Sequence, residues 1–96
     1  MYIVLGYNKT FKALSDGTRR EILRLLSEKE MNAGEISSHF NISKPSISHH
    51  LNILKAAKLV QVERKGQERI YFLNMTVMQE FLTDLLEFFG GPENEL

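Results

Sequence analysis

The most constraining feature of this chain is a pair of short helical patterns separated by three residues. The first opens at Asn32, which with Glu35 has the pattern of a capping box, in which two helix-terminal N–H groups are satisfied reciprocally. The second opens at Ser43 as N-cap, with Pro45 in the first turn, where a missing N–H costs little. Residues 41–43 are the predicted turn. Two such helices joined by a tight turn form a helix-turn-helix.

Apolar residues at helical spacing support both helices. Ile36 and Phe40 lie four residues apart in the first. Ile47, Leu51 and Leu54 follow one another at i, i+4 and i+7 in the second. We expect all five side chains to face the core.

Further helices are predicted on either side of this motif. A short helix is expected over residues 8–14, and an amphipathic helix that starts within 15–18 and ends near 27–29. A longer helix is predicted over residues 76–89, where two glycines and a proline end it.

A β-hairpin is predicted between the helix-turn-helix and the last helix. Residues 60–64 alternate apolar and polar side chains, residues 69–73 are rich in β-branched and aromatic ones, and 65–67 form the turn. A helix-turn-helix followed directly by a hairpin is the winged form. The element order is therefore α-α-α-α-β-β-α, a mainly α fold with a small β-hairpin (α+β class), and 96 residues suffice for one domain.

Charge is separated along the chain, although the formal net charge is zero. Residues 43–69 hold six Lys or Arg and two Glu, a net charge of +4. Residues 70–96 hold five acids and no Lys or Arg, a net charge of −5. One end of the molecule is therefore expected to attract phosphate, as in nucleic-acid binding, while the other repels it.

The exposed side of the second helix-turn-helix helix and the hairpin tip are the predicted contacts with double-stranded DNA. At 100° per residue, short polar and cationic side chains lie opposite the apolar stripe of this helix. We expect Ser46, Ser48 and His49 to read bases, with Ser43 and Lys44 on phosphate. The full predicted DNA-binding set is Ser43, Lys44, Ser46, Ser48, His49, Asn52, Arg64, Lys65 and Arg69.

The last predicted helix carries apolar residues on two adjoining sides, more than a monomer of this size would bury. A two-fold dimer is the commonest way to cover such a surface. A ligand pocket or a well-buried helix is the alternative. The predicted dimerisation residues are Phe11, Phe81, Leu82, Leu85, Leu86 and Phe89.

Residues that other functions need are absent or badly placed. The chain has no cysteine, which excludes disulfides and thiolate metal sites. His49 and His50 are adjacent on a helix, point about 100° apart and cannot easily chelate one ion together. Ser48 and His49 are likewise no catalytic pair, which must meet through space. We predict no enzyme activity, no cofactor and no metal site.

Because no apolar run reaches the ~18–20 residues of a membrane span, we expect a cytoplasmic protein without membrane insertion.

Three stretches, residues 11–23, 43–54 and 64–73, carry a family resemblance. They are similar to the opening helices, the recognition helix and the wing of ArsR-type winged-helix repressors, and in particular to the metal-free SdpR-type autorepressor branch. The resemblance implies a homodimer built from the first and last helices. It also implies repression of a small operon that often includes the repressor's own gene.

This sequence departs from the family pattern at three places. Gly17 stands where the family usually has Pro, which loosens a loop. Residues 1–9 extend beyond the usual start, so Tyr2 to Tyr7 are either disordered or docked across the dimer. Metal-sensing members carry paired cysteines in the third helix or Asp/His pairs in the last helix, and this chain has neither.

The predicted organisation is a single winged-helix DNA-binding domain over residues 1–96. Within it, 1–9 are an N-terminal extension, 76–89 the dimerisation helix and 90–96 an acidic tail. The predicted mechanism is occlusion of a promoter by a dimer on a palindromic operator, with recognition helices about 34 Å apart.

Two alternatives stay open. A winged-helix module that binds protein would instead show an apolar face on the second helix and an uncharged hairpin, and this sequence has neither. A small-molecule sensor would hold an apolar pocket between the terminal helices of the dimer. The inducer of a repressor would accordingly be a small molecule or a protein.

Overall fold

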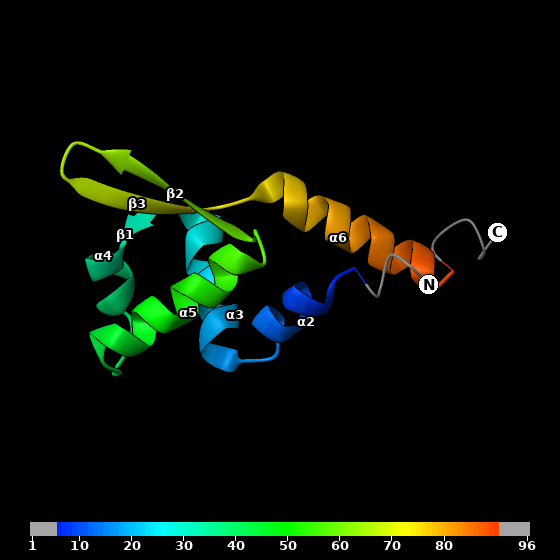
Figure 1. Cartoon of the computed structure of the whole chain (residues 1–96), viewed down its shortest axis with the longest axis horizontal. Coiled ribbons are helices and arrows are strands. Elements are labelled where there is room, and N and C mark those ends of the chain that lie inside the picture. The colour runs from blue at the N-terminus through cyan, green and yellow to red at the C-terminus, as the bar shows by residue number, and fades with distance from the viewer. Residues whose placement is uncertain (1–5, 91–96) are drawn as a thin grey trace.

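The computed structural model describes residues 6–90, which form five helices and a three-stranded sheet (Figure 1). In chain order the elements are α2 (Asn8–Leu14), α3 (Gly17–Glu28), β1 (Met31–Asn32), α4 (Ala33–Ser37), α5 (Lys44–Ala56), β2 (Val60–Lys65), β3 (Glu68–Leu73) and α6 (Met75–Phe88). 

The element order is the predicted one with a short strand, β1, added. The mainly α fold with a small sheet is therefore confirmed.

The core lies where α3, α4 and α5 meet the sheet. The apolar residues predicted to face the core are buried there, except that Phe40 is only partly buried against the other core residues. The largest fully buried side chains are Ile22, Ile36, Ile47, Leu51, Leu54, Leu59 and Val60.

Three antiparallel strands form the sheet, in the order β1-β3-β2. The predicted hairpin is β2–β3, which we call the wing. Its turn is the pair Gly66 and Gln67, where Gly66 has a φ of +63°. The strand β1 was not predicted because it has two residues, too few for an alternation to be visible. Asn32 belongs to β1 and is also the N-cap of α4, where the predicted capping box with Glu35 is present.

The connection between α4 and α5 is longer than the predicted three-residue turn. The helix α4 ends at Ser37, so residues 38–43 separate the two helices. The Ser38 hydroxyl donates to the Glu35 carbonyl, which favours an end to the helix here. The next two backbone bonds, from His39 to Ile36 and from Phe40 to Ser37, span three residues rather than four, which tightens the last turn.

The helix α5 ends in a Schellman motif. The Leu59 N–H donates to the Leu54 carbonyl, and the Lys58 N–H donates to that of Lys55. Lys58 occupies the left-handed position, with a φ of 62°. This motif turns the chain from α5 into the wing.

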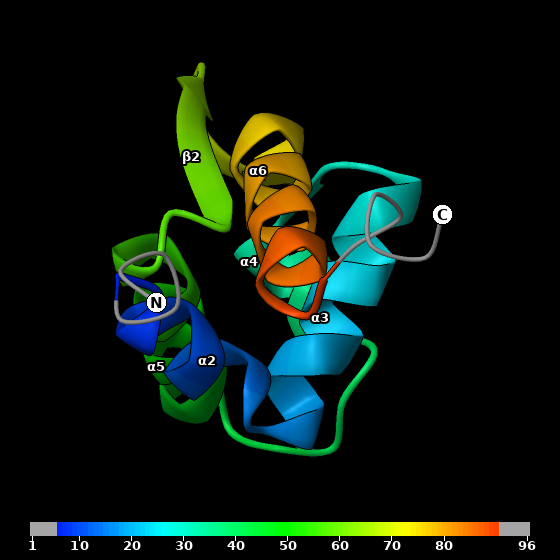
Figure 2. The ribbon, with the colours of Figure 1, turned by 90° about the vertical axis from the view of Figure 1, so that its right-hand side faces the viewer.

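The helix α6 lies beside the rest of the protein rather than within it (Figures 1 and 2). Phe81 is its one buried residue in the described part of the chain. The rings of Tyr7 and Phe11 pack edge-on against Phe81, with centroids 4.9 and 5.5 Å away. The Tyr7 hydroxyl also donates to Asp84, at 2.6 Å. Tyr7, which lies in the predicted N-terminal extension, is thus docked on α6 of its own chain, while residues 1–5 lie outside the described part.

Candidate nucleic-acid interface

The helix α5, which the sequence analysis predicts to be the recognition helix, divides into a buried and an exposed side, as expected from its apolar spacing. Its buried side holds the apolar stripe. The exposed side holds four of the predicted DNA contacts: Lys44, Ser48, His49 and Asn52. The N-terminal end of α5 and the tip of the wing lie toward the same end of the molecule, and α6 extends toward the other (Figure 1).

Ser43 and Ser46 hold the start of the recognition helix. The Ser43 hydroxyl oxygen accepts the Ser46 N–H at 3.2 Å, and the Ser43 hydroxyl donates to Ser46 Oγ at 3.0 Å. Ser46 is half-buried. Both hydroxyls therefore stabilise the helix terminus. Their predicted contacts with DNA would be additional to this role.

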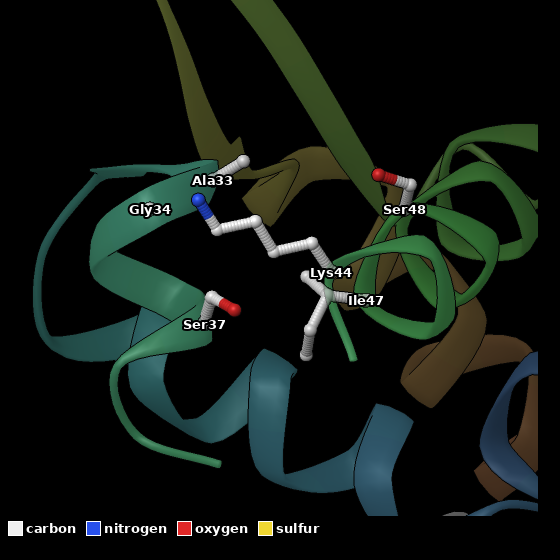
Figure 3. A pocket seen from close by; sticks show the side chains of 6 residues that line it. All are labelled: Ala33, Gly34, Ser37, Lys44, Ile47 and Ser48. Carbon is white, nitrogen blue, oxygen red and sulfur yellow. The ribbon is translucent and has the colours of Figure 1, made fainter. Parts of the chain in front are cut away.

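Lys44 lies beside a hollow of about 220 Å³ between α4 and α5. Figure 3 shows its side chain extended toward Ala33 and Gly34 at the start of α4, with Ser37 and Ser48 on either side. The ammonium group therefore lies between the two helices of the motif. A phosphate that bridges the start of α4 and the start of α5 would meet this cation.

The wing has two different faces. Residues directly opposite each other in an antiparallel pair share a face, and successive pairs alternate. Arg64 pairs with Arg69, two positions from the pair of Val62 and Tyr71, so both arginines lie on the core-facing side of the hairpin, beyond its apolar part. Both arginines are exposed.

Lys65 lies on the other face, where it pairs with Glu68 across the turn. Its Nζ forms a salt bridge with Glu30 at 2.8 Å, and this carboxylate raises the pKa of Lys65. Asn32 Nδ2 donates to Glu68 at 2.6 Å. These contacts hold the wing to the segment before α4. The structure thus separates the three cations that the sequence analysis grouped at the wing tip.

Glu30 and Arg19 were not among the predicted site residues. Glu30 carries no sequence signal, because its partner is 35 residues away. Arg19 lies in the first turn of α3 and is only 7% exposed. Its guanidinium reaches His50 of the recognition helix. A charged residue within an amphipathic helix gives no sign of burial until the fold is known.

The predicted dimerisation residues lie mainly on an exposed stripe of α6. Leu82, Leu86 and Phe89 are 49, 58 and 76% exposed, and Phe11 of α2 is 39% exposed. Leu85 is half-buried. Phe81 is different, because only 3% of it is exposed and its own chain covers it. Phe81 therefore packs against Tyr7 and Phe11 within its own chain and does not belong to the exposed stripe.

Two further observations concern other chemistries. No three His, Cys, Asp or Glu side chains between residues 6 and 90 come together in a group that could hold a metal ion. Over the same residues, no helix is both long and apolar enough to span a bilayer.

Comparison with known proteins identifies the family. The sequence model of "Bacterial regulatory protein, arsR family" matches residues 16–62. Transcriptional repressor SdpR of Bacillus subtilis (strain 168) is 55% identical over 89 residues, which cover 93% of this chain and 99% of the relative.

Solved structures agree with the sequence relatives. The ArsR-like transcriptional regulator from Rhodococcus sp. RHA1 has a TM-score of 0.82 and 30% identity, over 94% of this chain and 84% of that one. The solution structure of a homodimeric winged helix-turn-helix DNA-binding domain from Mycobacterium bovis has a TM-score of 0.69 and 29% identity. It covers 78% of this chain and 70% of that one. With a matched helix-turn-helix and 55% identity to one curated relative over nearly its whole length, this chain belongs to the ArsR family of bacterial regulatory proteins.

Proposed function

We propose that this chain is a transcriptional repressor that binds a palindromic operator in double-stranded DNA as a homodimer, and that it regulates its own operon. The observation that carries the proposal is that the N-terminal end of α5 lies at the same end of the molecule as the tip of the wing (Figure 1). The exposed side of α5 is polar, and Arg64 and Arg69 pair next to the wing turn. A helix in the major groove and a basic hairpin on the adjacent backbone together read and hold a duplex.

On this proposal, base readout falls to the exposed residues Ser48, His49 and Asn52, with Ser46 at their edge. Phosphate contacts fall to Lys44 and to the pair Arg64 and Arg69, whose guanidinium groups can each bind phosphate in a bidentate manner. Lys65 contributes less, because Glu30 already neutralises it.

A second copy of the chain is the partner proposed for the exposed stripe of α6. Met75, Leu82 and Phe89 are spaced by seven residues, so they align on one side of the helix. Leu86 lies beside them. The homodimeric relative from Mycobacterium bovis supports the same assembly. Burial of this stripe would bring α6 and Phe11 of each copy to the two-fold axis.

Repression would follow from occlusion of the promoter by this dimer. The name of the Bacillus subtilis relative, transcriptional repressor, supports repression over activation. The absence of cysteine from the sequence, and of histidine from the last helix, supports regulation by something other than a metal.

The deciding experiment is the selection of bound duplexes from a random library by the purified protein at near-physiological salt. We expect an inverted repeat with half-sites about one helical turn apart. We also expect the repeat to occur upstream of the protein's own gene. If no motif is recovered and binding disappears as salt rises, the proposal is wrong, and a protein partner for the winged helix becomes the better candidate.

A further inference from the structure

The buried side chain of Arg19 joins three helices. Its Nε donates to the Ala13 carbonyl at 2.9 Å, and its Nη2 donates to the Lys12 carbonyl at 3.0 Å. Both carbonyls lie in the last turn of α2, and the Lys12 carbonyl also accepts the N–H and the hydroxyl of Ser15, the C-cap of that helix. Its Nη1 lies 3.1 Å from Nδ1 of His50 in α5. One cation from α3 thus closes the end of α2 and contacts the recognition helix.

The direction of the last contact follows from the chemistry of arginine. A guanidinium group has only donors and stays protonated. Nδ1 of His50 must therefore accept, which places the proton of the neutral imidazole on Nε2. Three charged or titratable groups surround this ring. Arg19 is hydrogen-bonded to it, Asp16 lies 3.9 Å from Nδ1, and the ring of His49 is 5.9 Å away between centroids.

Arg19 thus connects α2 with α5, and these two helices have different roles in the proposed function. The helix α2 carries Phe11, which packs on Phe81 of α6 next to the proposed dimer interface. His50 directly follows His49, a proposed base contact on the exposed side of α5. His50 is half-buried, and its hydrogen bond with Arg19 orients its ring toward the protein.

We propose that Arg19 and His50 are a positioning pair for DNA binding: their hydrogen bond fixes the recognition helix relative to the helices that form the dimer. This inference rests on the proposed function. In a dimer, the angle of each recognition helix to the two-fold axis sets the distance between the two half-sites. Without the bond, α5 can adopt more orientations, so a smaller fraction of the molecules holds the orientation that matches the operator. The apparent affinity for the operator falls in proportion to that fraction.

Two substitutions of His50 separate the hydrogen bond from the bulk of the ring. His50→Asn keeps an acceptor, because Asn Oδ1 occupies nearly the position of Nδ1. His50→Leu removes the acceptor and keeps an apolar group of comparable size. We expect His50→Leu to weaken binding to the selected operator about tenfold, as if one tenth of the molecules held the competent orientation. We expect His50→Asn to bind within about twofold of the wild type.

A second pair of variants controls for the closure of α2. Arg20 also donates to a carbonyl of this helix, Leu14 O at 2.7 Å, but within residues 6–90 it forms no hydrogen bond with α5. Lysine cannot reproduce the forked geometry of a guanidinium group. Arg19→Lys should therefore lose operator affinity, and Arg20→Lys should keep it. Melting temperature and dimer dissociation are measured for each variant, so that loss of folding or of assembly is recognised.

The tautomer is tested without DNA. In a long-range 1H–15N spectrum of the imidazole groups at neutral pH, we expect His50 to show an unprotonated Nδ1 and a protonated Nε2. A protonated Nδ1 would overturn the proposal, and so would wild-type affinity in a folded His50→Leu dimer. If His50→Leu does not fold, weak binding by a folded His50→Asn dimer overturns it instead. A wild-type protein with no operator preference would refute the proposed function and leave the tautomer result standing.

Discussion

Arg64 and Arg69 are direct cross-strand partners at the tip of the wing, and both are exposed. Like charges in this arrangement destabilise a hairpin. A phosphate group between the two guanidinium groups would relieve the repulsion. The arrangement is therefore costly in the isolated protein, and on the proposed function it would become favourable on a duplex, as at a site that serves binding and not stability.

The wing arginines should account for more of the salt dependence of DNA binding than Lys65 does. We expect Arg64→Ala and Arg69→Ala each to reduce the slope of log K against log salt by about one unit. Lys65→Ala should change it by less, because Glu30 holds this ammonium group on the other face. Titrations of operator DNA at several salt concentrations measure the slopes. A larger effect of Lys65→Ala than of either arginine variant would contradict this assignment.

Lys44 and His49 should fail in different ways when replaced. Lys44→Ala removes a phosphate contact, so we expect weaker binding to operator and random DNA alike, with a slope about one unit smaller. His49→Ala removes a predicted base contact, so we expect operator affinity to fall more than non-specific affinity. Parallel titrations of both duplexes decide between the roles. Equal losses on the two duplexes for His49→Ala would show that this residue does not read sequence.

A charge on the stripe of α6 should separate the dimer without unfolding the chain. Leu86 is 58% exposed in one copy, so Leu86→Glu should leave the monomer folded. In the proposed dimer it would bury an unpaired charge at a cost of about 3 kcal/mol or more, which is a loss of more than ~100-fold in dimer affinity.

Sedimentation over a range of protein concentrations measures this change. Thr83→Glu is the matched control, because Thr83 is exposed on the polar side of the same helix. An unchanged concentration dependence for Leu86→Glu would place the dimer interface elsewhere.

Local patterns predicted the elements well, because caps and apolar periodicity act over a few residues. Asp16, Asn32, Ser43 and Asn74 all cap helices through their own side chains. Asn74 was not singled out in advance, and α6 accordingly begins one residue earlier than predicted. The end of α4 was misjudged because the apolar spacing of Phe40 fits a helix, while the hydroxyl of Ser38 competes with the backbone there.

Long-range contacts could not be predicted in the same way. The salt bridge of Lys65 with Glu30 and the contact of Arg19 with His50 join residues more than 30 positions apart. Composition and spacing showed that these residues are charged or titratable. Only the fold shows that Lys65 is neutralised, that Arg19 is buried, and that Phe81 is covered by Tyr7 and Phe11 of its own chain.

The contact between Tyr7 and Asp84 should make stability depend on pH in the alkaline range. The Asp84 carboxylate accepts the Tyr7 hydroxyl hydrogen, which raises the pKa of Tyr7 from 10.0 to about 12. The protonated phenol is thus favoured in the folded state. Its contribution is fully present below about pH 10 and is lost as the pH rises toward 12. We expect the contribution to be about 1 kcal/mol, because the pair is partly exposed.

Tyr7→Phe removes this contribution and keeps the packing on Phe81. Urea unfolding of both proteins, at one protein concentration because assembly also contributes to stability, gives the difference in the free energy of unfolding at each pH. We expect the wild type to be more stable below pH 10 and the difference to vanish near pH 12. The comparison cancels the titration of lysines and of the other tyrosines, which both proteins share. A difference that stays constant across this range would mean that the hydroxyl does not donate to Asp84 in solution, and that the aromatic contacts alone hold Tyr7 on α6.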